Sequence, residues 1–367
     1  MTIQPFRIAI PQSDVDDLAD RLSRTRWPDE LPGAGWSRGV PLEFLKELAA
    51  YWTDGYDWRA AEARLNDYPQ YVTEIDGQPI HFLHVRCDNP GALPLVLTHG
   101  YPSLFAEFTS LIEHLRQDFH LVVPSLPGFG FSTPVREAGW AMGRTARAWA
   151  ELMSRLGYDR YGVHGGDIGA GVSGAVAGLD GEHVAGVHVV TDALTAANTA
   201  SFLPGMADGL DPEDEVDRLI LDRIAKFRSE GSGYLAIQNS RPQTVGYLLN
   251  DSPAGQLGWI AEKFEEWTDL PYDRDQLLTI VSLYWFTGSG ISAARFLYEQ
   301  AHSTDWGAPA AVPQGVSVFG ADATVRKLLN PSADTYWAEH ERGGHFPAME
   351  APEAVAADLR AFFGRLK

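Results

Sequence analysis

The sequence predicts an α/β protein with a mostly parallel central sheet, a helical lid and an N-terminal helical extension. Strand-like and helix-like segments alternate in the first half of the chain, for example an apolar strand at 93–98 and a helix at 104–115. Repeated units of this kind favour a parallel sheet covered by helices, because such strands are buried on both faces. The strand signal nearly disappears between 196 and 306 and returns at 315–319, before a last helix at 352–363. The helical insertion indicates a lid over a functional site.

Helical patterns also dominate the first 70 residues, where apolar side chains recur every three or four positions, as in amphipathic helices. This segment contains no glycine-rich catalytic loop, so we expect it to be a platform packed on a later domain. The predicted organisation is an N-terminal helical segment (1–70), a core in two parts (71–195 and 307–367) and a lid (196–306).

The remaining elements are predicted from their own patterns and flanking turns. A turn at Asp76-Gly77 separates the first two strands of the core. The expected core strands are 71–75, 80–85, 93–98, 119–123, 160–164 and 184–190, a core helix is expected at 144–156, and lid helices are expected at 213–229, 252–267, 274–286 and 291–301.

Composition limits the functions that are compatible with this chain. The 367 residues carry a net charge of -20 without a dense run of Lys or Arg, which argues against a nucleic-acid partner. Cys87 is the only cysteine, so an intrachain disulfide and a multi-cysteine metal cluster are excluded. The sequence has neither a secretory signal pattern nor an apolar run of about 18 residues. We therefore expect a cytoplasmic enzyme without membrane contact; a homodimer is one oligomeric state compatible with the sequence.

The most informative segment is Gly165-Gly166-Asp167-Ile168-Gly169, between a strand-like stretch and a run of small residues. Small residues around a central polar one are typical of a nucleophile elbow, a strained strand-to-helix turn that exposes its central side chain. An aspartate there is already an anion at neutral pH and, unlike serine, needs no base. It can attack an alkyl carbon and leave an ester on the enzyme. The alternative is a glycine-rich turn in which Asp167 caps a helix.

Two partners of this nucleophile are expected near the C-terminus. Arg342-Gly343-Gly344-His345-Phe346 places a histidine in a glycine-containing loop before the last helix, so His345 is the candidate base. A carboxylate should orient the imidazole and stabilise its charged form. Asp322, just beyond the strand at 315–319, has the expected chain order, and Asp192, after the preceding strand, is the competing acid.

Backbone N–H groups are expected to form an oxyanion hole. Ile168 follows the nucleophile directly and supplies one of them. Tyr101, in Thr98-His99-Gly100-Tyr101-Pro102 after a buried strand, supplies the second. His99 is expected to hold this loop by a structural hydrogen bond. The constellation calls for neither a cofactor nor a metal.

Four motifs together resemble the microsomal-type epoxide hydrolases of the α/β-hydrolase superfamily. They are the HGYP loop, the GGDIG elbow, the RGGHF loop and a lid run that comprises 233–238, 244–246 and 250–253. The N-terminal portion resembles that family's own N-terminal domain, notably at Tyr56-Asp57-Trp58-Arg59 and Asp76-Gly77. The resemblance covers nearly the whole chain and implies the α/β-hydrolase fold.

This resemblance implies a two-step hydrolysis of an epoxide to a vicinal diol. Asp167 would open the ring by backside attack and form an ester. His345, oriented by Asp322, would then activate the water that cleaves the ester. The division agrees with the residues themselves, because a carboxylate needs no base in the first step whereas water does in the second.

Lid tyrosines are implied as hydrogen-bond donors to the epoxide oxygen. Tyr234 matches the family directly. The family's second tyrosine falls at Leu297, and Tyr298 is a candidate one place further, where a helix turns the side chain by about 100°. Family members usually carry tryptophan after the nucleophile, so Ile168 changes the pocket wall and keeps the backbone donor.

Three alternatives compete with this prediction. A haloalkane dehalogenase also uses an aspartate, but it should offer indole or amide groups to the halide, whereas this chain offers Ile168 and lid tyrosines. A serine esterase is disfavoured because Ser173 does not stand at the elbow. A non-catalytic ligand-binding protein on the same scaffold would not need nucleophile, acid, histidine and tyrosine together.

The substrate is constrained only by the aromatic lid. Its composition favours a bulky apolar or aromatic epoxide, with Trp285 and Phe286 as candidate substrate contacts and with water as the second reactant. Similarity to soluble bacterial members raises natural-product biosynthesis, for example of enediyne-like polyketides, with detoxification as the alternative.

Overall fold

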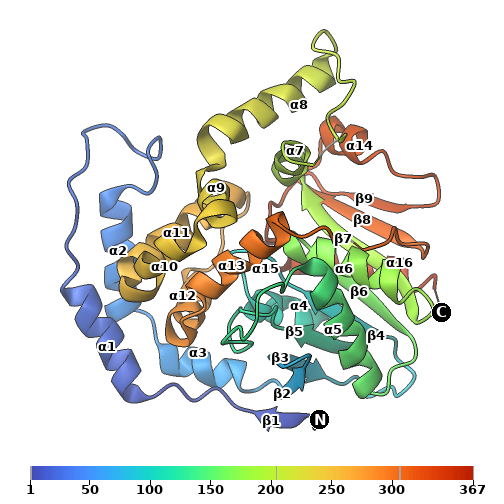
Figure 1. The fold of residues 1–367 in the computed structure, drawn as a ribbon, viewed down its shortest axis with the longest axis horizontal. Coiled ribbons are helices and arrows are strands. Elements are labelled where there is room, and N and C mark those ends of the chain that lie inside the picture. Colours follow the sequence, from blue (N-terminus) through green and yellow to red (C-terminus); the bar gives the residue numbers. More distant parts are fainter. Residues whose placement is uncertain (1, 204, 306, 367) are drawn as a thin grey trace.

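The computed structural model describes residues 2–203, 205–305 and 307–366, so the predicted boundaries at residues 1, 306 and 367 lie outside these ranges. The described strands form one sheet in the order β1-β2-β3-β5-β4-β6-β7-β8-β9 (Figure 1). Strands β4 to β9 pair in parallel, whereas β1, β2 and β3 are antiparallel to their neighbours, which confirms the predicted mostly parallel sheet. The strands are β1 (Gln4–Phe6), β2 (Gln70–Ile75), β3 (Gln78–Val85), β4 (Pro94–Thr98), β5 (His120–Pro124), β6 (Tyr161–Gly165), β7 (Val184–Asp192), β8 (Gln314–Phe319) and β9 (Tyr336–Glu339).

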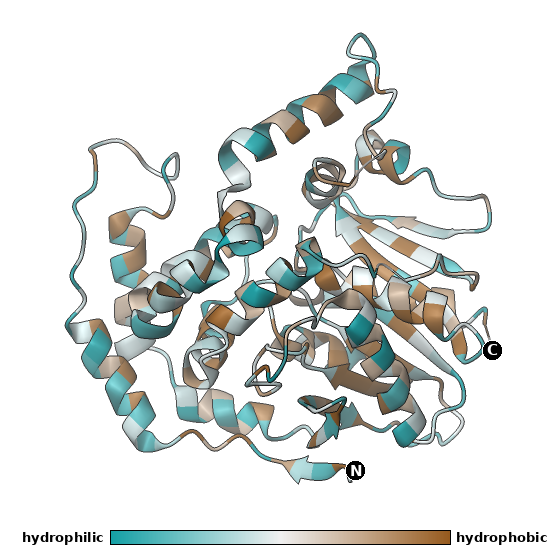
Figure 2. Cartoon of the chain, in the orientation of Figure 1, coloured by the Kyte–Doolittle hydropathy of each residue, from teal (hydrophilic) through white to brown (hydrophobic). Residues whose placement is uncertain are grey.

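The centre of the sheet is apolar on both faces. Every residue of β4, β5 and β6 is buried, and the apolar residues of β4 and β5 are brown in the hydropathy colouring (Figure 2). Strands covered on both faces carry apolar side chains at successive positions, which is the pattern that predicted β4. Helices α4 and α16 pack together beside the sheet, as do α5 and α6. The helices of the core are η1 (Phe105–Phe108, a 3-10 turn), α4 (Thr109–Leu115), α5 (Met142–Arg155), α6 (Ile168–Leu179), α14 (Ala323–Leu329), α15 (Pro347–Glu350) and α16 (Pro352–Phe363).

The chain between β7 and β8 is helical in its described residues. Helix α10 packs on α11 and α13, while α7 and α8 share a small separate core with β8 and α14. No single helix of the described residues is long and apolar enough to cross a membrane; α12 and α13 satisfy that test only as a pair, bent by 89° at their break. The helices are α7 (Ala193–Ala200), α8 (Glu215–Lys226), the π-helical turn η2 (Phe227–Gly231), α9 (Gly233–Ser240), α10 (Pro242–Asp251), α11 (Pro253–Trp267), α12 (Arg274–Thr287) and α13 (Gly290–Ala301).

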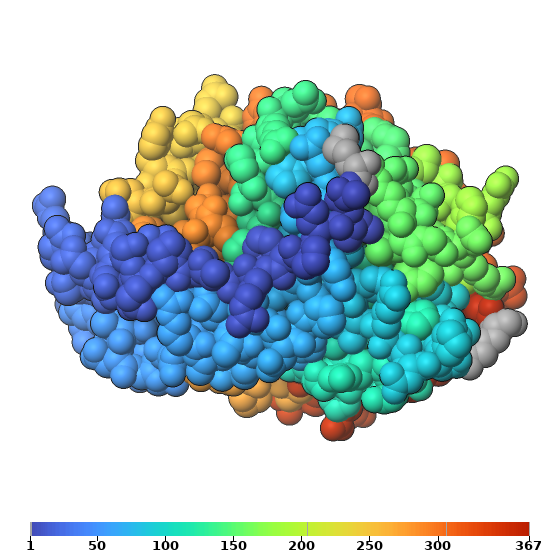
Figure 3. Space-filling model, turned by 90° about the horizontal axis from the view of Figure 1, so that it is seen from below, coloured from blue at the N-terminus to red at the C-terminus, as the bar shows by residue number. Residues whose placement is uncertain are grey.

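The N-terminal extension packs against the lid helices α11 and α12. Its helices are α1 (Gln12–Ser23), α2 (Leu42–Asp54) and α3 (Trp58–Leu65). The indole of Trp52 donates a hydrogen bond to Ser282 Oγ at 2.9 Å, a buried link between α2 and α12. Figure 3 shows the N-terminal residues, in blue, spread across one face of the molecule beside the yellow and orange lid. The extension therefore adds β1 to the edge of the sheet and packs its helices on α11 and α12.

Seven elements were not predicted from periodicity, and each is ten residues long or shorter, which leaves little pattern to detect. Helix α7 is rich in alanine, and β9 is a short edge strand whose side chains are half-buried or exposed. The other five are β1, α9, α10, α14 and α15.

Candidate active site

The segment 165–169 is a sharp turn from β6 into α6 with Asp167 at its apex. Asp167 has φ 52° and ψ -127°, in the left-handed half of backbone space that side chains other than glycine rarely adopt. A Cβ on Gly169 would lie 1.9 Å from the Thr98 carbonyl oxygen, and one on Gly165 would lie 2.4 Å from the Gly169 backbone. Glycine is therefore required at both positions. The Asp167 side chain makes no capping hydrogen bond to α6, which argues against the capped-turn interpretation.

One oxygen of the Asp167 carboxylate is held by the predicted loop after β4. The Tyr101 N–H donates a hydrogen bond to Oδ1 at 2.8 Å. Gly100 permits this approach, because a Cβ there would lie 2.5 Å from the Asp167 side chain. Nε2 of His99 accepts a hydrogen bond from the Leu126 N–H, as expected of a residue that holds the loop in place. Ile168 begins α6, and its side chain is buried.

His345 lies beside the second oxygen of this carboxylate. Its Nε2 is 3.7 Å from Asp167 Oδ2, and its side chain is only 8% exposed, against 30% for Asp167. The backbone N–H of His345 donates to the Trp267 carbonyl oxygen at 2.9 Å, and the Trp267 ring stands edge-on to the imidazole. The loop before α15 and the end of α11 therefore fix the histidine together.

Asp192, the last residue of β7, lies on the other side of the imidazole. Its Oδ2 is 3.6 Å from Nδ1 of His345, and the Thr195 hydroxyl lies 2.8 Å from the same nitrogen. The carboxylate accepts the N–H groups of Leu194 and Thr195 at the start of α7, and also the Thr195 hydroxyl. A helix N-terminus with its free N–H groups stabilises such an anion.

Burial and charge oppose each other in this pair. Burial would raise the pKa of Asp192, but the hydrogen bond and charge of His345 and the bonds from Thr195 lower it below its usual value. Burial would lower the pKa of His345, but Asp192, with the negative charge of Asp167, raises it. The protonated imidazole is thus stabilised between two carboxylates.

Asp322 does not contact His345 in the described structure. It caps α14 through the Thr324 N–H at 2.9 Å and forms a 2.6 Å ion pair with Arg223 of α8. Burial would raise the pKa of Asp322, whereas the bonds to Arg223 and Thr324 lower it. The structure therefore does not contain the expected pairing of Asp322 with His345. The Arg223 guanidinium binds the Asp322 carboxylate, and Asp192 lies beside Nδ1 of His345 instead.

Tyr234 lies at the start of α9 above this group. Its ring is parallel to that of Tyr101, with centroids 6.2 Å apart and planes 5° apart. Burial, followed by the negative charge of Asp167, raises the pKa of the Tyr234 phenol well above its usual value. The protonated phenol is therefore available to donate a hydrogen bond near the nucleophile.

Comparison with known proteins shows the family of this chain. Residues 3–108 match the family model of the epoxide hydrolase N terminus, and residues 94–277 match that of the alpha/beta hydrolase fold. A protein of Stigmatella aurantiaca, whose name assigns it provisionally to the epoxide hydrolases, is 44% identical over 100% of this chain and 86% of its own length. The chain belongs to the epoxide hydrolases.

Two solved epoxide hydrolase structures are similar along nearly their whole length. The Aspergillus niger epoxide hydrolase is 30% identical with a TM-score of 0.87, covering 100% of this chain and 97% of that one. The juvenile hormone epoxide hydrolase of the silkworm Bombyx mori is 31% identical with a TM-score of 0.86, covering 100% and 95%. The α/β-hydrolase fold and the enzyme class expected from the sequence are confirmed.

Three further aromatic residues expected at the site of this epoxide hydrolase have other neighbours. Tyr298 stacks on His302, with ring centroids 4.1 Å apart. Trp285 lies under the Arg21 guanidinium of α1, and Phe286 packs on Trp58 of α3, so both rings face the N-terminal extension. The shift of one residue from Leu297, which packs in the main core, accounts for the orientation of Tyr298.

The phenol of Tyr101 is a feature of this epoxide hydrolase that the sequence did not reveal. Its oxygen accepts hydrogen bonds from the Trp259 indole at 2.6 Å and from the Gln238 amide at 2.7 Å. Tyr284 lies nearby, with its hydroxyl donating to the Ser103 carbonyl oxygen at 3.1 Å. Trp259 and Tyr284 contact residues that are distant in the sequence, so the sequence could not assign them to the site. Their location in the aromatic segment between 196 and 306 was the only signal.

Glu107 is a further buried carboxyl that the sequence did not single out. It lies in η1, and burial raises its pKa to about 7, against the lowering effects of a Ser103 hydrogen bond and the charge of His345. The only sign of its burial in the sequence is its position between apolar neighbours in Phe105-Ala106-Glu107-Phe108.

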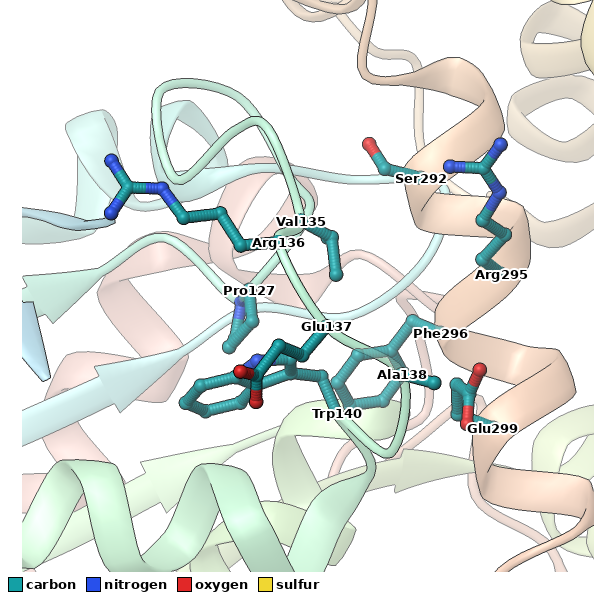
Figure 4. A pocket seen from close by; sticks show the side chains of 10 residues that line it. All are labelled: Pro127, Val135, Arg136, Glu137, Ala138, Trp140, Ser292, Arg295, Phe296 and Glu299. Carbon is teal, nitrogen blue, oxygen red and sulfur yellow. The ribbon is translucent and has the colours of Figure 1, made fainter. Parts of the chain in front are cut away.

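A separate cavity lies away from these residues. Its volume is about 220 Å³, and its walls come from the 127–140 loop and α13 (Figure 4). Trp140 and Phe296 form apolar walls, while its charged rim includes Arg136, which forms an ion pair with Glu74. None of the residues around Asp167 lines it. The described residues also contain no cluster of three or more His, Cys, Asp or Glu side chains suited to a metal.

Proposed function

We propose that this epoxide hydrolase forms an ester on Asp167 and hydrolyses it with water activated by His345. The observation that carries the proposal is the setting of the Asp167 carboxylate. One oxygen accepts the Tyr101 N–H at 2.8 Å, and the other lies 3.7 Å from His345 Nε2. An oriented anion beside an imidazole supports a nucleophile and a base that act in successive steps.

In the first step, an oxygen of Asp167 attacks one epoxide carbon from the side opposite the ring oxygen, and that carbon–oxygen bond breaks. The released oxygen takes the proton of Tyr234, which becomes a phenolate. The product is a hydroxyalkyl ester of Asp167. An alkoxide is far more basic than a phenolate, so a phenol whose proton is retained at neutral pH suits this transfer.

In the second step, His345 takes a proton from water, and the hydroxide adds to the ester carbonyl carbon. The oxyanion is stabilised by the N–H groups of Tyr101 and Ile168. When the intermediate collapses, the alkoxide leaves and takes the proton from His345. Asp167 emerges as a carboxylic acid, and its proton returns to the Tyr234 phenolate. One epoxide and one water have become one vicinal diol.

We assign the orientation of His345 to Asp192 and not to Asp322. The assignment is supported by the 3.6 Å separation of Asp192 Oδ2 and His345 Nδ1, with the Thr195 hydroxyl beside both. Asp322, in contrast, is engaged by Arg223 at 2.6 Å. Tyr298 has no comparable support as a proton donor, because its ring is stacked on His302.

For the substrate we propose a bulky apolar or aromatic epoxide, as in the biosynthesis of a natural product. The rings of Tyr234, Trp259, Trp267 and Tyr284 around the site support this class. A panel of aryl and alkyl epoxides with chiral analysis of the diols tests it. A preference for short alkyl epoxides would contradict the proposal.

We also propose a cytoplasmic enzyme that associates as a homodimer. The compartment is supported by the single free, buried cysteine, Cys87. The exposed apolar side chains Tyr247 and Leu248 of α10 support self-association. Cell fractionation and light scattering test the two statements separately.

The decisive experiment is a single turnover, with enzyme in excess, in heavy-oxygen water. The ester route predicts an unlabelled first diol, because its new hydroxyl oxygen comes from Asp167, and label in the enzyme instead. Heavy oxygen in the first diol would contradict the route. A haloalkane substrate serves as a control, because halide release would favour a dehalogenase.

Variants separate the two steps. Asp167→Asn should abolish diol formation and ester formation while the protein stays folded. His345→Gln should accumulate an ester that intact mass spectrometry detects. If the His345→Gln variant still turns over at the native rate, His345 is excluded as the base.

A further inference from the structure

A buried lysine lies beside the active site and takes no part in the two steps above. Lys263 belongs to α11, and only 5% of its side chain is exposed. Lysine is almost never buried to this extent unless it is paired. Its ammonium Nζ lies 2.8 Å from Glu262 and 3.4 Å from Glu266. The group is therefore a cation held in place within the lid.

The Lys263 ammonium also lies over two aromatic rings of the site. Its Nζ is 4.8 Å from the centroid of the Tyr234 ring and 5.6 Å from that of Trp267. Both distances lie within the range of about 6 Å in which a cation is attracted by the negative face of a ring. Trp267 in turn contacts His345, and Tyr234 stacks on Tyr101.

The charge of Lys263 matters most when the phenol of Tyr234 loses its proton. A neutral phenol offers the cation only the quadrupole of its ring, whereas a phenolate offers a full negative charge. The carboxylates of Asp167 and Glu266 act in the opposite direction, because they disfavour a phenolate. Lys263 is the cation that lies over this ring within the lid.

We propose that Lys263 is a positioning residue that stabilises the Tyr234 phenolate formed when Tyr234 protonates the opened epoxide oxygen. The inference rests on the proposed function, in which Tyr234 is the proton donor. Lys263 contacts the ring of Tyr234, so it acts through that residue. It holds the ring by its charge and lowers the barrier to proton transfer in the ester-forming step, and not in ester hydrolysis.

The competing role for Lys263 is purely structural. A cation between Glu262, Glu266 and the Trp267 ring could anchor α11 without any effect on chemistry. Such an anchor would act equally whether or not position 234 carries a hydroxyl. The hydroxyl of Tyr234 therefore separates the two roles.

The test is a double-mutant cycle on the rate of ester formation, measured by stopped flow on the intact enzyme. Lys263→Met removes the charge and retains the length of the chain, and Lys263→Arg retains the charge. We expect Lys263→Met to slow ester formation roughly tenfold and Lys263→Arg to stay within about threefold of the native rate. In Tyr234→Phe, the added Lys263→Met should change the rate by less than about twofold.

A fall of equal size in both backgrounds would overturn the proposal and assign Lys263 to the structure of the lid. If Lys263→Met does not fold, Lys263→Gln takes its place in the same cycle. An unchanged rate of ester formation in Lys263→Met, with Tyr234 in place, would also overturn the proposal.

Failure of the proposed function would appear elsewhere. If Tyr234→Phe alone forms the ester at the native rate, Tyr234 is not the proton donor, and the inference about Lys263 falls with it. If native enzyme forms no ester, the route through Asp167 is wrong. Both results differ from the outcome that would contradict the role of Lys263 alone. In that outcome, Lys263→Met lowers the rate of ester formation equally with tyrosine and with phenylalanine at position 234.

Discussion

Asp192 and His345 meet at the end of β7, with 3.6 Å between Oδ2 and Nδ1. Thr195 joins them, because its hydroxyl lies 2.8 Å from Nδ1 and donates to Asp192. The acid and its bridging hydroxyl thus come from one strand-to-helix junction, where the N-terminus of α7 stabilises the carboxylate. Asp322 occupies the corresponding junction after β8 and binds Arg223 there.

Exchange of each acid for its amide should separate their roles. Asp192→Asn is expected to slow ester hydrolysis by roughly 10⁴-fold, because an amide cannot stabilise the imidazolium and favours the wrong tautomer. Asp322→Asn still caps α14 and loses only a half-exposed ion pair, so we expect less than a tenfold effect on rate and about 1 kcal/mol or less on stability. Single-turnover rates and chemical denaturation measure both. A larger kinetic loss in Asp322→Asn would reverse the assignment.

The pH dependence of ester hydrolysis should report His345. In the free enzyme, burial opposes but does not cancel the effect of Asp192 and Asp167, which raises the pKa of His345 above its usual value of about 6.5. Esterification removes the charge of Asp167, so the pKa of His345 in the ester should lie below that in the free enzyme and depend on Asp192. Since only the neutral imidazole accepts a proton, the rate should fall as pH drops through that pKa, and Asp192→Asn should move this midpoint to lower pH. A midpoint that Asp192→Asn leaves unchanged would contradict the assignment.

The same pKa shifts predict how stability depends on pH. The raised pKa of His345 means that its contribution is fully present below about pH 6.5 and is lost as pH rises through the folded-state pKa. The lowered pKa of Asp192 contributes stability above about pH 3.9 that is lost as pH falls through its folded-state pKa. Denaturant titrations of native enzyme, His345→Gln and Asp192→Asn across pH measure these contributions.

Glu107→Gln should change stability with the opposite dependence to an ordinary carboxylate. Burial raises the pKa of Glu107 to about 7, so the folded protein must accept a costly buried charge as pH rises through that value. The variant should therefore gain free energy of unfolding relative to native enzyme above pH 7 and show little difference near pH 5. The negative charge of Glu107 raises the pKa of His345 in the native enzyme. In Glu107→Gln, the fall in the rate of ester hydrolysis at acid pH should therefore occur at a lower pH. Identical stability profiles would exclude the titration of Glu107.

Two glycines of α6 provide a matched pair. Gly169→Ala puts a Cβ 1.9 Å from the Thr98 carbonyl oxygen, so we expect a loss of at least about 3 kcal/mol of stability and loss of activity. Gly174→Ala, on the same helix, meets no heavy atom within 4 Å and should gain up to about 1 kcal/mol from helix propensity. Thermal unfolding with activity assays compares them, and equal effects would refute the packing argument.

The local parts of the site were predictable because each depends on a short stretch of chain. Glycines around Asp167 predicted the turn, and a strand followed by His99 and Gly100 predicted the loop whose next N–H holds the carboxylate. The glycines before His345 predicted a histidine in a turning loop. The missed or misplaced residues, such as Trp285, depend on which helix packs against which.

By itself, the sequence determined the α/β sheet, the aspartate at its elbow and the histidine that follows. Each of these depends on the apolar residues and glycines within a short stretch of chain. Only the tertiary structure decided which carboxylate meets His345. Helix α8 brings Arg223 to Asp322 across about a hundred positions, and the end of β7 brings Asp192 to the imidazole. Helix α11 likewise brings the charge of Lys263 to the ring of Tyr234. The interaction between two charges depends on their distance in space, and the number of residues between them in the sequence does not determine that distance.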